Sequence, residues 1–270
     1  MSSGLVLVPV TVMDHRGANV GGLGKESFTV LDDGRPQPIT SFYSEDAPCS
    51  VGLVIDASGS VKNRLDWEKR AAHAFLASSN LEDDVFVSTV SSSPAVFAPA
   101  DVAAVGEQVR AVQAGGWTAL FDTIRLATNQ LKHSRRSCRA LVALSDGMDN
   151  HSRWTKSELL RFLVESDIQV YSIAVEGVES VAKGVPLAES KRGIAFMSDL
   201  AERTGGLSVS VRDNQNPAAA AHRISAALRN RYVVGYRTPD ADASGKWHAI
   251  RVKVDQSKVN VYARSGYRAQ

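Results

Sequence analysis

The sequence lacks several features that define whole classes of protein. Only two of its 270 residues are cysteine, Cys49 and Cys138, which is too few for a disulfide-rich scaffold or a cysteine-based zinc site. No apolar run approaches the roughly 20 residues that a membrane-spanning helix needs. Basic residues barely outnumber acidic ones, 31 against 29. We therefore expect neither a membrane span nor a nucleic-acid partner.

What remains is the balance of an ordinary globular protein. Hydrophobic residues make up 44% of the chain and charged residues 22%. These fractions argue against disorder and against collagen-like repetition. The length is sufficient for one large domain or two modest ones, with a sizeable hydrophobic core.

The middle of the chain alternates between short apolar runs and amphipathic stretches. The apolar runs predict strands at 50–55, 84–90, 140–144, 168–175 and 207–211, with a hairpin partner at 95–97. Helical spacing appears at 61–79, 101–113, 119–132, 159–164, 194–203 and from Pro217 onward. This alternation predicts an α/β fold, with a doubly wound and mostly parallel sheet. We expect 176–193 to be a long loop, either functional or mobile.

Both ends of the chain have the pattern of β-structure. Strands are predicted at 5–12, 27–31 and 37–43, and again at 231–236, 247–254 and 259–264. Three strands alone form a marginal sheet, so the two zones are expected to pair with each other. We therefore predict a small, discontinuous β-sandwich from residues 1–48 and 231–270, beside an α/β domain at 49–230.

Five oxygen-bearing side chains lie in three loops of the predicted α/β domain. Asp56, Ser58 and Ser60 follow the first apolar strand, Thr118 precedes the 119–132 helix, and Asp146 follows the 140–144 strand. Ligands of open α/β sheets bind at the carboxyl ends of the strands, so these residues can converge there. Hydroxyl and carboxylate oxygens select Mg²⁺, Mn²⁺ or Ca²⁺ over softer metals.

The order Asp56-x-Ser58-x-Ser60, Thr118, Asp146-Gly147 resembles the metal-ion-dependent adhesion site of a von Willebrand factor type A domain. The flanks at 23–37, 232–236, 247–248 and 263–267 are similar to bacterial VWFA-related domain proteins, described chiefly from acidobacteria. The resemblance implies that the three hydroxyls contact the metal directly and that the aspartates act largely through water. It also implies that a carboxylate of a protein or peptide partner completes the shell, in a non-enzymatic adhesion module.

Other interpretations of the same residues stay open. Asp56 and Asp146 could serve a metal-dependent hydrolase such as a phosphatase, although no residue is left to activate a nucleophile. A structural subunit with a vestigial metal site is a third possibility. Trp117 is either a partner-facing aromatic residue or a packing residue. Asp149 and Asn150 either contact a partner at the rim or form a solvated turn.

The two cysteines and the N-terminus bear on location. Cys49 lies seven residues before Asp56, and Cys138 lies eight before Asp146. If their strands are parallel neighbours, the thiols are close enough for a disulfide, although two half-buried free thiols remain the alternative. The N-terminus lacks a charged segment before an apolar one, so it is either a cytosolic start or a processed end. Resemblance and a possible disulfide favour an extracellular or periplasmic protein.

Overall fold

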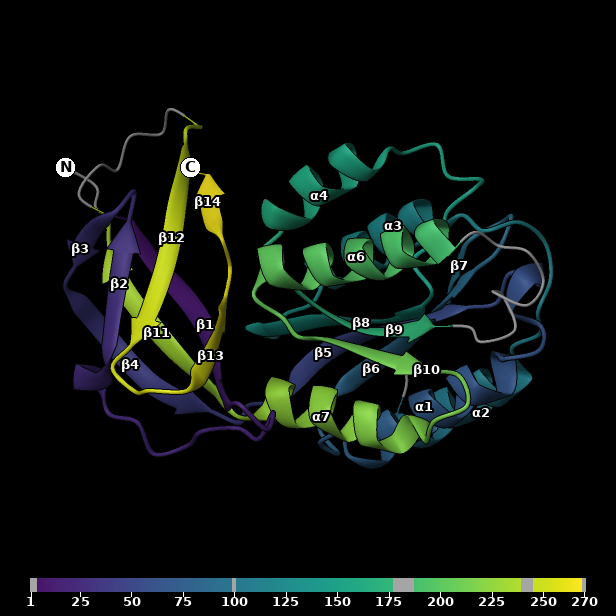
Figure 1. Ribbon diagram of the computed structural model, residues 1–270, viewed down its shortest axis with the longest axis horizontal. Coiled ribbons are helices and arrows are strands. Elements are labelled where there is room, and N and C mark those ends of the chain that lie inside the picture. Colours follow the sequence, from purple (N-terminus) through teal and green to yellow (C-terminus); the bar gives the residue numbers. More distant parts are fainter. Residues whose placement is uncertain (1–3, 99–100, 177–186, 239–244, 269–270) are drawn as a thin grey trace.

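The computed structural model describes residues 4–98, 101–176, 187–238 and 245–268. An α/β layer lies beside two smaller β-sheets, which contain both the first and the last strands of the chain (Figure 1). The predicted fold class, an α/β sheet with a small sandwich from the terminal segments, is confirmed. The exact division of the chain at 48/49 and 230/231 stays a prediction.

The α/β layer contains a six-stranded sheet in the order β10-β9-β8-β5-β6-β7. All neighbours are parallel except β7, which pairs antiparallel with β6 as the hairpin prediction required. The first strand of this sheet, β5, lies between β6 and β8, so the strand order reverses there. The strands are β5 (Cys49–Asp56), β6 (Asp84–Val90), β7 (Ala95–Val96), β8 (Cys138–Ser145), β9 (Gln169–Glu176) and β10 (Ser208–Arg212).

Helices cover both faces of the sheet because its central strands are apolar on both sides. On β5, Val51 and Leu53 pack toward one set of helices and Val54 toward the other. The first set is α1 (Leu65–Ala77), α2 (Val102–Ala111) and α7 (Pro217–Arg229); the second is α3 (Leu120–Lys132), α4 (Lys156–Val164) and α6 (Leu187–Thr204) (Figure 1). Within the described ranges, none of the helices is both long and apolar enough to cross a bilayer.

Helix starts follow local capping chemistry. Thr155 and Glu158 form the reciprocal capping box at the start of α4, and Asn216 accepts the N–H of Ala218 at the start of α7. The prediction of a loop at 176–193 is wrong from Leu187 onward, because α6 begins at that residue. The residues that follow Leu187, from Ala188 to Arg192, include no large apolar side chain, so hydrophobic spacing did not reveal this part of the helix. The remainder of that loop, 177–186, lies outside the described residues.

Two four-stranded sheets pack against each other beside the α/β layer. One has the order β13-β1-β11-β4 and the other β14-β12-β2-β3. Val8, Val10, Val30 and Tyr236 lie in the core between them. The strands are β1 (Leu5–Asp14), β2 (Phe28–Asp32), β3 (Arg35–Gln37), β4 (Ile39–Glu45), β11 (Arg231–Arg237), β12 (Trp247–Val254), β13 (Val259–Ala263) and β14 (Gly266–Arg268).

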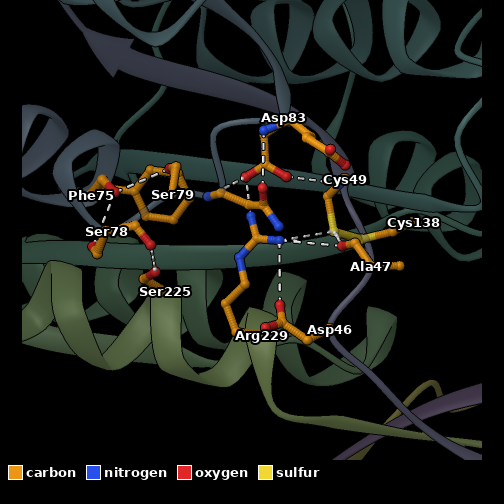
Figure 2. A network of polar contacts seen from close by, with 12 residues as sticks. Asp46, Ala47, Cys49, Phe75, Ser78, Ser79, Asp83, Cys138, Ser225 and Arg229 are labelled. Atoms are coloured by element: carbon orange, nitrogen blue, oxygen red, sulfur yellow. Dashed lines mark hydrogen bonds and ion pairs between the residues drawn. A yellow bond between two sulfur atoms is a disulfide. The ribbon is translucent and has the colours of Figure 1, made fainter.

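The junction between the two parts is a polar network around Arg229, Asp83 and the disulfide of Cys49 and Cys138 (Figure 2). Arg229, at the end of α7, pairs with buried Asp83, and Asp83 accepts the backbone N–H of Cys49 at 2.8 Å. Cys49 and Cys138 lie directly opposite each other on β5 and β8 and form a disulfide, with their Cα atoms 4.6 Å apart. Arg231, the first residue of β11, donates to the sulfur of Cys138 at 2.9 Å. The network therefore connects the start of both central strands to the start of β11.

Replacing both Cys49 and Cys138 by Ser should lower the free energy of unfolding by about 2–5 kcal/mol, since the disulfide restricts the unfolded chain. Urea unfolding of the wild type and the double variant, each with and without reductant, measures this loss. Reductant should destabilise only the wild type. If the unreduced, unfolded wild type offers two thiols to an alkylating reagent, the disulfide assignment is wrong.

Candidate metal centre

The first loop of the candidate site is organised around Asp56, the last residue of β5. Its side chain is completely buried. One carboxylate oxygen, Oδ1, accepts hydrogen bonds from the backbone N–H and the hydroxyl of Ser58, at 3.1 and 2.7 Å. The hydroxyls of Ser58 and Ser60 are 2.9 Å apart. Because Ser58 is buried and Ser60 exposed, the two hydroxyls lead from Asp56 toward the surface.

The third loop reaches Asp56 from the neighbouring strand. Ser145, the last residue of β8, donates its hydroxyl to Oδ2 of Asp56 at 2.9 Å. Asp146 follows, and its Oδ1 accepts the N–H of Met148 at 3.0 Å. Gly147 has a positive φ of 78°, and a Cβ there would clash with the backbone of Gly193 in α6. The turn that aims Asp146 therefore requires glycine at 147.

The second loop is bonded to both of the others. Gly59 donates its N–H to the carbonyl of Gly116 at 2.9 Å. Thr118 donates its N–H to Oδ1 of Asn150 at 2.9 Å, and its carbonyl accepts the N–H of Asn150 at 3.0 Å. The structure thus brings the backbones of all three predicted loops together. That the hydroxyl of Thr118 joins those of Ser58 and Ser60 around a metal stays a prediction.

The three predicted rim residues differ in what their side chains contact. Asn150 holds the backbone of Thr118, and Asp149 accepts the N–H of Phe121 and the hydroxyl of Ser152. Both side chains therefore brace the loops. Trp117 is 62% exposed, and its ring stacks on His151 at a centroid distance of 6.3 Å. The rim role stays a prediction for all three, and Trp117 has the exposure that such a role needs.

An ion pair at the start of α1 was missed by the sequence analysis. Arg64 donates from Nη2 to Oδ2 of Asp146 at 2.6 Å, and its Nε lies 3.4 Å from Oε1 of Glu68. Arg64 is only 6% exposed and Glu68 is completely buried. The other oxygen of Glu68, Oε2, is buried without a hydrogen-bond partner. One signal was available: Glu68 lies three residues after Leu65 and four before Ala72, on the apolar face of the predicted helix.

Burial dominates the electrostatics of this cluster. It raises the pKa of Asp56, with a further increase from the charge of Asp146. It also raises the pKa of Glu68 well above its usual value. Burial lowers the pKa of Arg64, but Asp146 and Glu68 outweigh that effect and raise it, so the guanidinium stays charged. With all groups ionised, three carboxylates face one guanidinium, and a hard divalent cation would balance the difference.

A second group of possible metal ligands lies in the sandwich. Asp32, Asp33 and His248 have ligand atoms within 4.8 Å of one another. Oδ2 of Asp32 accepts the hydroxyls of Tyr236 and Tyr267, and Nδ1 of His248 lies 3.5 Å from Asp32 and 3.2 Å from Asp33. These contacts account for the cluster as a hydrogen-bond network of two buried residues and exposed Asp33, without a metal.

Comparison with known proteins gives the same fold. Residues 51–148 match the model of the von Willebrand factor type A domain. An uncharacterized protein of Borreliella burgdorferi is 23% identical over 189 residues, 62% of this chain. The match spans 55% of that relative, about half its length.

Two solved structures align with TM-scores of 0.55 at 14% sequence identity, which shows the fold alone. A von Willebrand factor type A structure from Catenulispora acidiphila covers 99% of this chain and 63% of its own. Proximal thread matrix protein 1 from the mussel byssus, solved with a zinc-occupied MIDAS motif, covers 73% of this chain and 49% of its own.

Glu68→Gln should stabilise the metal-free protein, increasingly as the pH rises. Because the pKa of folded Glu68 is raised, the folded wild type loses stability between the unfolded pKa, about 4.3, and its own higher pKa. The glutamine variant lacks this loss. Urea unfolding in chelator at about pH 5, 7 and 8 should show a widening advantage for the variant. An advantage that is constant or shrinks with pH would contradict the assignment.

Proposed function

We propose that this chain, whose residues 51–148 match the model of the von Willebrand factor type A domain, binds an acidic group of a protein partner through a divalent cation. Domains of that family typically mediate protein–protein interaction. The observation that carries this proposal is the convergence of three loops bearing hydroxyl and carboxylate oxygens at the carboxyl ends of β5 and β8. The protein then acts as a binding module, not as an enzyme.

The residues present fit a hard cation. The hydroxyls of Ser58, Ser60 and Thr118 would bind it directly, and Asp56 and Asp146 would hold it through water. Neutral hydroxyls would not neutralise the charge of such a cation. The remaining positive charge would favour a carboxylate of the partner as a further ligand. Mg²⁺ is the expected ion, with Mn²⁺ or Ca²⁺ as substitutes. The zinc in the byssus protein supports metal binding at a motif of this kind, without fixing the metal here.

The surroundings of the two aspartates favour binding over hydrolysis. The side chain of Asp56 is completely buried and both of its oxygens accept hydrogen bonds, so this carboxylate does not face a phosphate ester in solvent. The oxygens of Asp146 are engaged by Met148 and Arg64. A phosphatase would need one of these carboxylates to face its substrate as a nucleophile or a base.

An extracellular or periplasmic location is part of the proposal. Disulfides persist mainly in oxidising compartments, and Cys49 and Cys138 form one in the core of the α/β layer. The disulfide supports export without distinguishing between the two locations.

Asp56→Ala should weaken Mg²⁺ and Mn²⁺ binding about 10–100-fold, as removal of an outer-shell carboxylate does in other metal sites. Calorimetric titration of the full chain measures this, with Asp66→Ala as the control because Asp66 is exposed on α1. Equal metal affinity of the wild type and Asp56→Ala would eliminate the site.

Partner capture tests the second half of the proposal. The immobilised protein should retain a partner from its native source in Mg²⁺ and release it in chelator, and free glutamate at high concentration should compete. Asp56→Ala should retain little, and Trp117→Ala should retain less than the wild type if its exposed ring contacts the partner. Retention that is unchanged by chelator would contradict a metal-bridged contact.

A further inference from the structure

We propose that Arg64 and Glu68 set the cation affinity of the candidate metal centre in opposite directions, Arg64 by competing for Asp146 and Glu68 by supplying negative charge. This inference rests on the proposed function. It concerns two residues that are outside the five predicted ligands and that no resemblance assigns.

Arg64 already occupies the place of a cation at Asp146. Its Nη2 atom donates to Oδ2 of Asp146 at 2.6 Å, and both side chains are largely withdrawn from solvent. Oδ1 of Asp146 is engaged by the N–H of Met148, so Oδ2 is the oxygen that a metal-bound water would have to share or take over. A divalent cation therefore has to weaken the bond between Arg64 and Asp146 in order to bind.

Glu68 gives the displaced guanidinium a second partner. Oε1 of Glu68 lies 3.4 Å from Nε of Arg64, a weak contact, and Oε2 has no partner although it is completely buried. A buried carboxylate oxygen without a partner is costly, so the arrangement gains when Arg64 turns toward it. Arg64 and Glu68 are one helical turn apart at the start of α1, which permits the exchange without movement of the backbone.

The charges of the cluster give the sign of each effect. Asp56, Glu68 and Asp146 carry three negative charges when ionised, and Arg64 carries one positive charge, which leaves two negative charges for one divalent cation. Glu68→Gln removes one of these charges and should weaken cation binding. Arg64→Gln removes the positive charge, so three negative charges remain for the cation, and it also frees Oδ2 of Asp146. This variant should therefore bind the cation more strongly. A purely structural pair would weaken binding in both variants.

Mn²⁺ binding to the full chain tests this, with the free ion measured by electron paramagnetic resonance. We expect Arg64→Gln to bind Mn²⁺ about 10-fold more tightly and Glu68→Gln about 10-fold more weakly than the wild type, each equivalent to about 1.4 kcal/mol. Arg64→Lys retains the charge and should bind close to the wild type. Arg110→Gln and Glu107→Gln are matched controls, because this pair is exposed on α2. Neither control should change the affinity.

The outcomes separate this inference from the proposed function. A wild type that binds no Mn²⁺ at millimolar concentration overturns both. A wild type that binds Mn²⁺, with both variants shifted in the same direction or not at all, overturns the inference and leaves the proposed function intact. If Arg64→Gln does not fold, as judged by circular dichroism, Glu68→Gln still decides: unchanged affinity overturns the inference, and weakened affinity with unchanged controls supports it.

Discussion

The parallel pairing of β5 with β8 is the contact on which both halves of this structure depend. Its register sets Cys49 opposite Cys138 at one end, so the disulfide forms without distortion of the strands. At the other end, the same register places Ser145 beside Asp56. Since side chains alternate along a strand, a shift of one residue would turn Asp56 to the other face and separate both pairs. One strand pairing thus fixes the junction with the sandwich and the candidate metal centre.

The candidate metal centre combines a rigid frame with uncompensated charge. Backbone bonds among the three loops, and glycine at 147, hold the oxygen atoms in place before any ligand arrives. Asp56 and Glu68 are completely buried and Asp146 is partly buried beside a single guanidinium, an excess of negative charge that a protein tolerates poorly unless a cation or protons balance it. The proposed roles of the five ligands and of Arg64 both follow from this imbalance.

Sequence reasoning recovered the elements that carry strong local signals. Apolar runs and helical stripes predicted the strands and helices, and loops after neighbouring strands predicted the contact between Asp56 and the Asp146 loop. It missed β3 and β14, which have three residues each and gain their order from partner strands. Arg64 escaped notice because a charge becomes informative only once its burial is known. The cysteines stayed ambiguous because pairing depends on strand order in space.

The sandwich combines strands from both ends of the described chain, so it can form only late in protein synthesis. Early strands of the sandwich pair with late ones: β1 pairs with β11 and β13, β4 pairs with β11, and β2 pairs with β12. Among the early strands of the described chain, only the β2–β3 hairpin can form from residues already made, and an isolated hairpin is marginal in water. A nascent chain must therefore carry the apolar faces of β1 and β4 unpaired on the ribosome until some 200 later residues have emerged. Holdase chaperones that shield these two strands should matter more to the yield of this protein than to that of its isolated α/β layer.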